Sequence, residues 1–203
     1  MERIPHKELS TDLLNARFDL SLFDSGDDHD DDELDLFLKK DALEEQQLLL
    51  SRTHLCFYRD RVAGFISLAA DSVRIDKLDK GQHVNGIEYP AYPCILIARL
   101  AVDKQLHKRG VGRFLLQLAI GFALDGPLGC RYLSVDPKKN SIDFYKKFGF
   151  NYWTTNKRRM YLNMEDVAKQ SQQEDSLDFW SIKESNGVGA PTQQSCGVFK
   201  IIK

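Results

Sequence analysis

The segment with the residue types best suited to chemistry is a basic turn that joins an apolar run to a helical pattern. The apolar run, residues 94–102, predicts a central strand buried on both faces, and residues 110–124 have the periodicity of a helix. The turn and the first helical residues supply three basic side chains and two glycines: Lys108, Arg109, Arg113, Gly110 and Gly112. A helix start exposes unpaired amides and a positive dipole end, and glycine lets a ligand approach the backbone. The turn therefore predicts a site for a phosphorylated ligand.

Two common phosphate-binding turns are excluded by the sequence. The G-x-x-x-x-G-K-[ST] pattern of a P-loop does not occur, and neither does the G-x-G-x-x-G pattern of a dinucleotide-binding fold. The turn therefore belongs to a different class of phosphate-binding protein.

The elements that would position this turn alternate between strand and helix patterns, which predicts an α/β (α+β) fold. Residues 33–49 predict an amphipathic helix, and residues 140–147 predict a short helix that ends at Gly149. The other expected strands cover residues 16–23, 53–59, 61–70, 131–136, 150–154 and 158–163, and residues 74–93 are expected to form an exposed loop.

The composition is that of one globular domain with a polar extension. The chain has 203 residues, 42% of them hydrophobic, and no apolar run reaches the roughly 18 residues needed to cross a bilayer. Because the N-terminus lacks the apolar segment of a secretory signal, we expect a cytoplasmic protein whose four cysteines stay free thiols and hold no metal. Residues 164–203 form the extension, for which short strands at 177–182 and 198–202 or partial disorder both stay open.

Charge is unevenly distributed along the chain. Eight of the 30 acidic residues lie between Asp24 and Asp35, with no Lys or Arg among them, so the rest of the chain has a net positive charge. The acidic run lacks the glycine of a calcium loop and is expected to be a solvated loop that leads into a helix. The positive remainder is compatible with nucleic-acid binding and equally with an ordinary solvated surface.

Residues Ile97–Leu116 resemble the signature segment of the GCN5-related N-acetyltransferases, the GNAT family. In that family a Q/R-x-x-G-x-G/A turn holds the pyrophosphate of acetyl-CoA. The matching residues here run from His107 to Gly112, with histidine in the first position. The resemblance implies acetyl-CoA as cofactor, with strand backbone holding its pantetheine arm. The cofactor-binding residues that it implies are Leu100, Ala101, Val102, His107, Lys108, Arg109, Gly110, Val111, Gly112 and Arg113.

Residues Asn140–Phe150 resemble the last helix and the following strand of the same family. Tyr145 falls on the family's tyrosine, which the resemblance implies as the general acid that protonates the CoA thiolate. A phenol with a reference pKa of about 10 is protonated at neutral pH and can supply that proton. No general base is identified, because Asp71 and Asp103 are equally explained as solvated groups at strand ends.

Together the two motifs imply the GNAT fold over residues 1–163. This fold has a central mixed, mostly antiparallel twisted sheet that splays between its two middle strands and is flanked by helices. The implied reaction is direct attack of a primary amine on the acetyl group.

Three further segments resemble a subfamily, the acetyltransferase toxins that are paired with ribbon-helix-helix antitoxins: Phe23–Ala42, residues 64–73 and Tyr89–Asp103. Several members acetylate the amino group of aminoacyl-tRNA. The resemblance therefore implies tRNA and such an antitoxin as partners. No membrane partner is expected, because no apolar run is long enough to cross a bilayer. A general small-molecule or protein N-acetyltransferase, a non-catalytic acetyl-CoA-binding module and a homodimer stay open.

Overall fold

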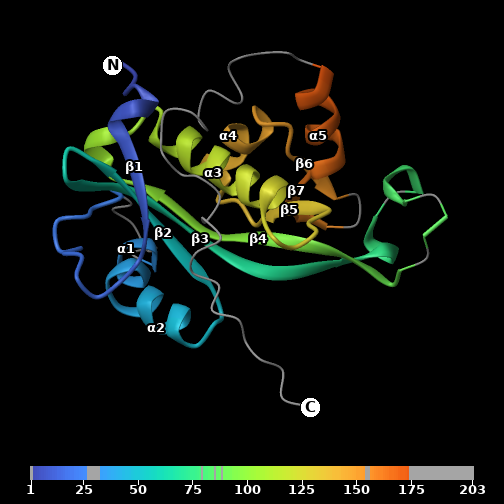
Figure 1. Cartoon of the computed structure of the whole chain (residues 1–203), viewed down its shortest axis with the longest axis horizontal. Helices are drawn as coiled ribbons and strands as arrows, with labels where there is room; N and C mark the ends of the chain where they lie inside the picture. Colours follow the sequence, from blue (N-terminus) through green and yellow to red (C-terminus); the bar gives the residue numbers. More distant parts are fainter. Residues whose placement is uncertain are drawn as a thin grey trace.

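The computed structural model describes residues 2–26, 33–78, 80–84, 86–87, 89–153 and 156–173 (Figure 1). Its strands are β1 (Leu9–Leu13), β2 (Arg52–Tyr58), β3 (Arg61–Arg74), β4 (Ala91–Val102), β5 (Tyr132–Val135), β6 (Asn151–Trp153) and β7 (Asn156–Asn163). Its helices are α1 (Glu33–Leu36), α2 (Ala42–Gln47), α3 (Val111–Asp125), α4 (Ile142–Lys146) and α5 (Met164–Gln173). A π-helical turn, Phe37–Asp41, joins α1 to α2.

The seven strands form one mixed sheet in the order β1-β2-β3-β4-β5-β7-β6. Within the described residues, β4 and β5 are the parallel pair, and they pair over only four residues, from Cys94↔Tyr132 to Ile97↔Val135. Beyond Ile97, β4 continues to Val102 and pairs with β3 alone. The sheet is therefore splayed between its two middle strands, which confirms the predicted fold class.

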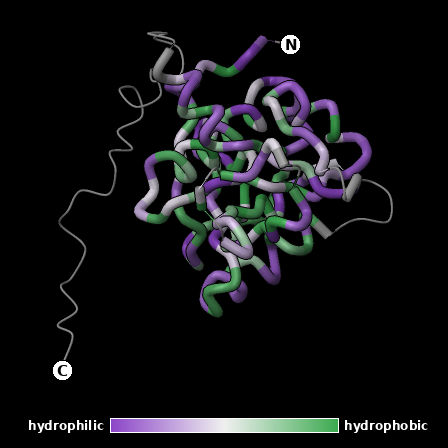
Figure 2. The backbone as a smooth tube through the Cα atoms, turned by 90° about the vertical axis from the view of Figure 1, so that its right-hand side faces the viewer, coloured by the Kyte–Doolittle hydropathy of each residue, from purple (hydrophilic) through white to green (hydrophobic). Residues whose placement is uncertain are grey.

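Helices cover both faces of the sheet. Figure 1 shows α3, α4 and α5 on one face and α1 and α2 on the other. The larger core lies under α3, whose buried residues include Val111, Leu115 and Leu116. A second core packs Phe37 and Leu38 of the π-helical turn against the opposite face. In Figure 2 the apolar segments gather toward the interior, as burial of one face of each element requires.

The predicted strand at residues 16–23 is wrong. The edge strand is Leu9–Leu13, which pairs antiparallel with β2. Side-chain oxygens of Asn15 and Asp19 instead accept the backbone amides of Arg17 (3.1 Å) and Ser21 (2.9 Å). These local turns compete with strand pairing, and the partial alternation of the sequence did not reveal them.

Most other predicted elements are confirmed, with one correction at the central strand. The predicted strand at 94–102 was expected to be buried on both faces. Several of its side chains are only partly buried, both where β4 pairs with β5 (Ile95, Leu96) and beyond Ile97 (Ala98, Arg99, Leu100). Beyond Ile97 the edge of β4 has no β5 beside it, and a run of apolar residues does not signal where a partner strand is lost.

The polar extension begins with a helix that the sequence analysis did not predict. In α5, Met164 is 3% exposed and Val167 packs against the larger core. Asn163 Oδ1 accepts the amide of Glu165 (3.0 Å), and Glu165 forms an ion pair with Arg131. The candidate strands at 177–182 and 198–202 and most of the acidic run lie outside the described residues. The domain boundary at residue 163 stays a prediction.

His54 on β2 makes the stability of the fold dependent on pH. Its ring lies against Phe122 of α3 (4.7 Å between centroids), and burial lowers its pKa from 6.5 to about 4, with Arg52 adding to the effect. Between pH 6.5 and about pH 4, His54 is therefore protonated in the unfolded chain but neutral in the folded one. The contribution of this group to the stability of the fold is fully present above pH 6.5 and is lost as the pH falls toward 4.

We expect the free energy of unfolding to drop by about 2 kcal/mol between pH 7 and pH 4.5 from this group alone. His54→Phe keeps a ring against Phe122 and should flatten that part of the profile. Chemical denaturation of both proteins at the two pH values checks this. An identical acid loss in wild type and variant would assign it to other groups.

Candidate active site

The turn between β4 and α3 is held in place by its own backbone and by the N-terminal segment. Asp103, 3% exposed, accepts the amide of Gln105 (3.0 Å), and its own amide donates to Ala63 O (2.9 Å). The carbonyl of Arg109 accepts the amide of Ile4 (3.0 Å). These bonds fix the path of the chain into the helix without using the amides of the helix start.

The start of α3 is open to an anion. Gly110 precedes the helix with φ +99°, a left-handed conformation that favours glycine, and no side chain caps the helix. In the described part of the chain, no group accepts a hydrogen bond from the amides of Val111, Gly112 or Arg113. Three unpaired amides at the positive end of a 15-residue helix form a suitable cradle for a diphosphate.

Gly112 brings three distant segments together at this cradle. A Cβ placed at Gly112 would lie 3.5 Å from Val102 Cγ2 at the end of β4 and 3.7 Å from the Phe144 ring on α4. The Arg113 guanidinium carbon lies 5.8 Å from the Phe148 ring centroid. The helix start, the free end of β4 and the α4 helix therefore meet in one place.

Tyr145 comes to this place on α4, directly after Phe144. It is 5% exposed, and its ring packs edge-on against Phe144 (5.1 Å) and Phe150 (5.4 Å). Burial raises the pKa of the phenol above its usual value of 10. The phenol therefore keeps its proton at neutral pH. Since no described residue hydrogen-bonds the hydroxyl, its O–H group is available to a ligand.

The four basic side chains of the turn and the helix start differ in whether they are available to an anion. Lys108 is exposed with φ +60°, and neither Lys108 nor Arg113 forms an ion pair with a described carboxylate. The Arg109 side chain turns away from the amides, because its Nε donates to Glu2 O (3.3 Å) and its guanidinium lies 5.5 Å from the Tyr58 ring centroid. His107 Nε2 lies 2.9 Å from Val102 O, so the ring contacts the strand backbone.

The predicted strand residues Leu100, Ala101 and Val102 lie on the part of β4 that has left β5. Ala98, two residues before Leu100, has no partner on β3, because the register shifts between Ser67 and Leu68. A bulge at this position increases the local twist and turns the following backbone groups toward the splay. Sequence reasoning missed this bulge, for which no turn residue gives a signal.

Both acidic candidates for a general base are already engaged. Asp103 caps the turn, and Asp71 accepts a hydrogen bond from Arg159 Nη1 (2.7 Å). Arg159 also binds both carboxylate oxygens of Asp136 at 3.0 and 2.8 Å. This cluster of Arg159, Asp71 and Asp136 joins β7 to β3 across the β4–β5 junction, a role that the sequence analysis did not assign.

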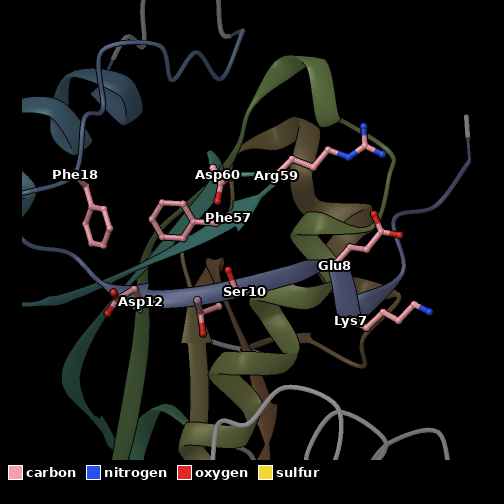
Figure 3. A pocket seen from close by; sticks show the side chains of 9 residues that line it. Lys7, Glu8, Ser10, Asp12, Phe18, Phe57, Arg59 and Asp60 are labelled. Carbon is pink, nitrogen blue, oxygen red and sulfur yellow. The ribbon is translucent and has the colours of Figure 1, made fainter.

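A separate groove of about 580 Å³ runs along the outer edge of the sheet (Figure 3). It is lined by Lys7, Glu8, Ser10, Thr11, Asp12, Phe18, Phe57, Arg59 and Asp60. None of the predicted site residues is among them. Because three acids stand beside two bases, this groove is a poor anion site and does not compete with the turn.

A mixed sheet that splays between its two middle strands, with a glycine turn leading from the free end of β4 into a helix, is the arrangement expected of a coenzyme A-dependent acyltransferase. The family model of the acetyltransferase (GNAT) family matches residues 13–150. The chain is 32% identical over 152 residues to the tRNA-acetylating toxin of Mycobacterium tuberculosis. This match covers 73% of this chain and 88% of the toxin. The chain therefore belongs to the GNAT family and is an acetyl-CoA-dependent N-acetyltransferase.

Two solved structures show how far the fold likeness extends. AtaT complexed with acetyl-methionyl-tRNAfMet has a TM-score of 0.72 at 22% identity and covers 80% of this chain and 99% of that one. AtaTR bound with AcCoA has a TM-score of 0.68 at 22% identity, covering 81% and 98%. Across the residues that the structure describes, no helix is both long and apolar enough to span a bilayer.

Proposed function

We propose that this chain transfers the acetyl group of acetyl-CoA to the amino group of aminoacyl-tRNA. The observation that carries the proposal is the match to a tRNA-acetylating toxin over 152 residues, a span that covers 88% of that protein. We further propose that the chain acts in the cytoplasm as the toxin of a pair. A solved neighbour, the Y144F mutant of the toxin AtaT, is bound to the C-terminus of the antitoxin AtaR, which supports an antitoxin as partner here. That this antitoxin is of the ribbon-helix-helix class is proposed from the subfamily resemblance alone.

The described residues fit the cofactor that this reaction needs. The amides of Val111, Gly112 and Arg113 hold the diphosphate, and Lys108 and Arg113 add positive charge. Leu100, Ala101 and Val102 offer backbone groups to the pantetheine arm, because no strand pairs with that edge of β4 in the described part of the chain. His107 and Arg109 shape the turn from outside through their contacts with Val102 O and Glu2 O.

Bound acetyl-CoA supplies an activated thioester, and the protein supplies position and one proton. Tyr145 keeps its proton at neutral pH because burial raises its pKa, and it donates this proton at its hydroxyl oxygen to the leaving sulfur. The acceptor enters as a free amine. Since Asp71 and Asp103 are engaged, a water molecule takes the proton that the amine releases.

An acceptor screen with labelled acetyl-CoA tests the proposed substrate. We expect label on charged tRNA and none on the same tRNA after its ester has been hydrolysed, because the acetylated amine leaves with the amino acid. Free amino acids and lysine-containing proteins serve as competing acceptors. Preferential labelling of a small amine or a protein would replace tRNA acetylation by a general N-acetyltransferase activity.

A further inference from the structure

Arg99 is a partly buried arginine at the point where β4 leaves β5. It follows the bulge residue Ala98 and pairs with Ser67 of β3, and no strand lies on its other side in the described part of the chain. It shares a face with Ala101, which belongs to the second core with Phe37 and Phe65. Arg99 therefore lies on the face that carries α1 and α2, opposite the α3 face with the amide cradle.

The described contacts of the Arg99 guanidinium fix its orientation but occupy few of its N–H donors. Its carbon lies 5.0 Å from the centroid of the Phe37 ring, and its Nη1 donates to Ala98 O at 2.9 Å. Phe37 in turn stacks on Phe65 (6.1 Å) and sits in the π-helical turn, a local distortion that is frequent at functional sites. An aromatic face under a guanidinium holds its plane while leaving the remaining N–H groups available.

Two other partly buried arginines of the sheet region are neutralised by carboxylates, and a third, Arg109, is held in the β4–α3 turn through Glu2 O and the Tyr58 ring. Arg159 binds Asp71 and Asp136, and Arg131 binds Glu165. Among the described residues, Arg99 forms no ion pair. A guanidinium that has lost part of its hydration without gaining a carboxylate is suited to an anion that arrives with a ligand.

The position of Arg99 indicates which ligand brings the anion. With the cofactor diphosphate assigned to the α3 side, the α1–α2 face is the other side of the splay, and Arg99 lies on it. We propose that Arg99 binds a phosphate group of the acceptor, adjacent to the amine that is acetylated. The inference rests on the proposed function, since the aminoacyl ester of tRNA sits on a terminal ribose whose own phosphate lies close by. The fork of N–H groups matches two phosphate oxygens, which Lys would not do.

The test compares two acceptors that differ in phosphate: aminoacyl-tRNA and the corresponding aminoacyl-adenosine, which has the base and ribose but no phosphate. Arg99→Met should raise KM for aminoacyl-tRNA by about 10-fold with little change in kcat. It should also lower the slope of log kcat/KM against log salt by about 0.7. For aminoacyl-adenosine, kcat/KM should stay within about two-fold.

Two further variants complete the design. Arg99→Lys keeps the charge and should raise KM for aminoacyl-tRNA by only about three-fold. Arg17→Met removes one positive charge at an exposed edge, where Arg17 pairs with Asp12 at 2.8 Å, and should leave both acceptors unaffected. Calorimetry with acetyl-CoA and melting curves verify that each variant is folded and binds the cofactor.

Each result decides the inference. An equal loss with both acceptors, or no loss with either, would overturn it, because Arg99 would then act on the fold or not at all. If the wild-type chain acetylates aminoacyl-adenosine but not aminoacyl-tRNA, the proposed substrate is wrong and the inference falls with it. A loss confined to aminoacyl-tRNA, with the reduced salt slope, is the expected outcome.

Discussion

Replacing Tyr145 by Phe should lower kcat by about 100-fold or more while acetyl-CoA affinity stays nearly unchanged, because a general acid acts in the transition state and not in binding. The substitution removes one oxygen that no described residue hydrogen-bonds, and the ring contacts with Phe144 and Phe150 survive. The melting temperature should therefore stay the same or rise slightly. Steady-state kinetics with a DTNB assay for released CoA, together with calorimetry, measure both quantities.

Tyr152→Phe is the matched control, since Tyr152 lies on the edge strand β6 with Lys146 Nζ 5.9 Å from its ring centroid. It should keep wild-type kcat. Full activity of the Tyr145→Phe protein would remove Tyr145 from the reaction and leave water as the proton donor. A loss of acetyl-CoA affinity equal to the loss of kcat/KM would instead make Tyr145 a binding group.

The pH profile separates the phenol from other groups. Because burial raises the pKa of Tyr145 above its usual value of 10, the phenol stays protonated up to at least pH 10. Any alkaline decline in kcat below pH 10 must therefore come from another group, and Tyr145→Phe should retain that decline at its lower rate.

The parts of the site that could be predicted are those that a short segment encodes by itself. The glycine turn is local: Gly110 takes the left-handed conformation that its residue type favours, and the helical pattern starts directly after it. Gly149, at φ +84°, likewise ends α4 where the sequence placed the end of a helix. The assignments of these residues to acetyl-CoA and of Tyr145 to proton donation stay predictions.

The parts that could not be predicted depend on contacts between distant segments. The bulge at Ala98 lies where β3 and β4 change register, and Arg99 is partly buried on the part of β4 that has no β5 beside it. Neither appears in a run of apolar residues. For α5, a capping signal was present, since Asn163 bonds the amide of Glu165, but the polar composition of the helix outweighed it.

Gly112→Asp should lower acetyl-CoA affinity by at least about 100-fold without unfolding the protein. Its Cβ would meet Val102 and Phe144 at ordinary contact distances of 3.5 and 3.7 Å, and an acid in the first turn of a helix favours the fold. The new carboxylate would repel the diphosphate from the cradle. Gly110 is a poorer test, because any side chain there is strained at φ +99° and meets Arg3 Cγ at 3.1 Å.

Two further variants separate the effect of the negative charge at residue 112 from the effects of side-chain size and of position on α3. Gly112→Asn has nearly the same size without the charge and should lose clearly less affinity than Gly112→Asp. Gly121→Asp places the same charge farther along α3, where a Cβ would meet no atom within 4 Å, and should bind acetyl-CoA normally. Calorimetry on each folded variant gives the three affinities. If Gly112→Asp binds acetyl-CoA as tightly as the wild type, the diphosphate does not lie at the start of α3, and the amides of this helix cannot be what holds the cofactor.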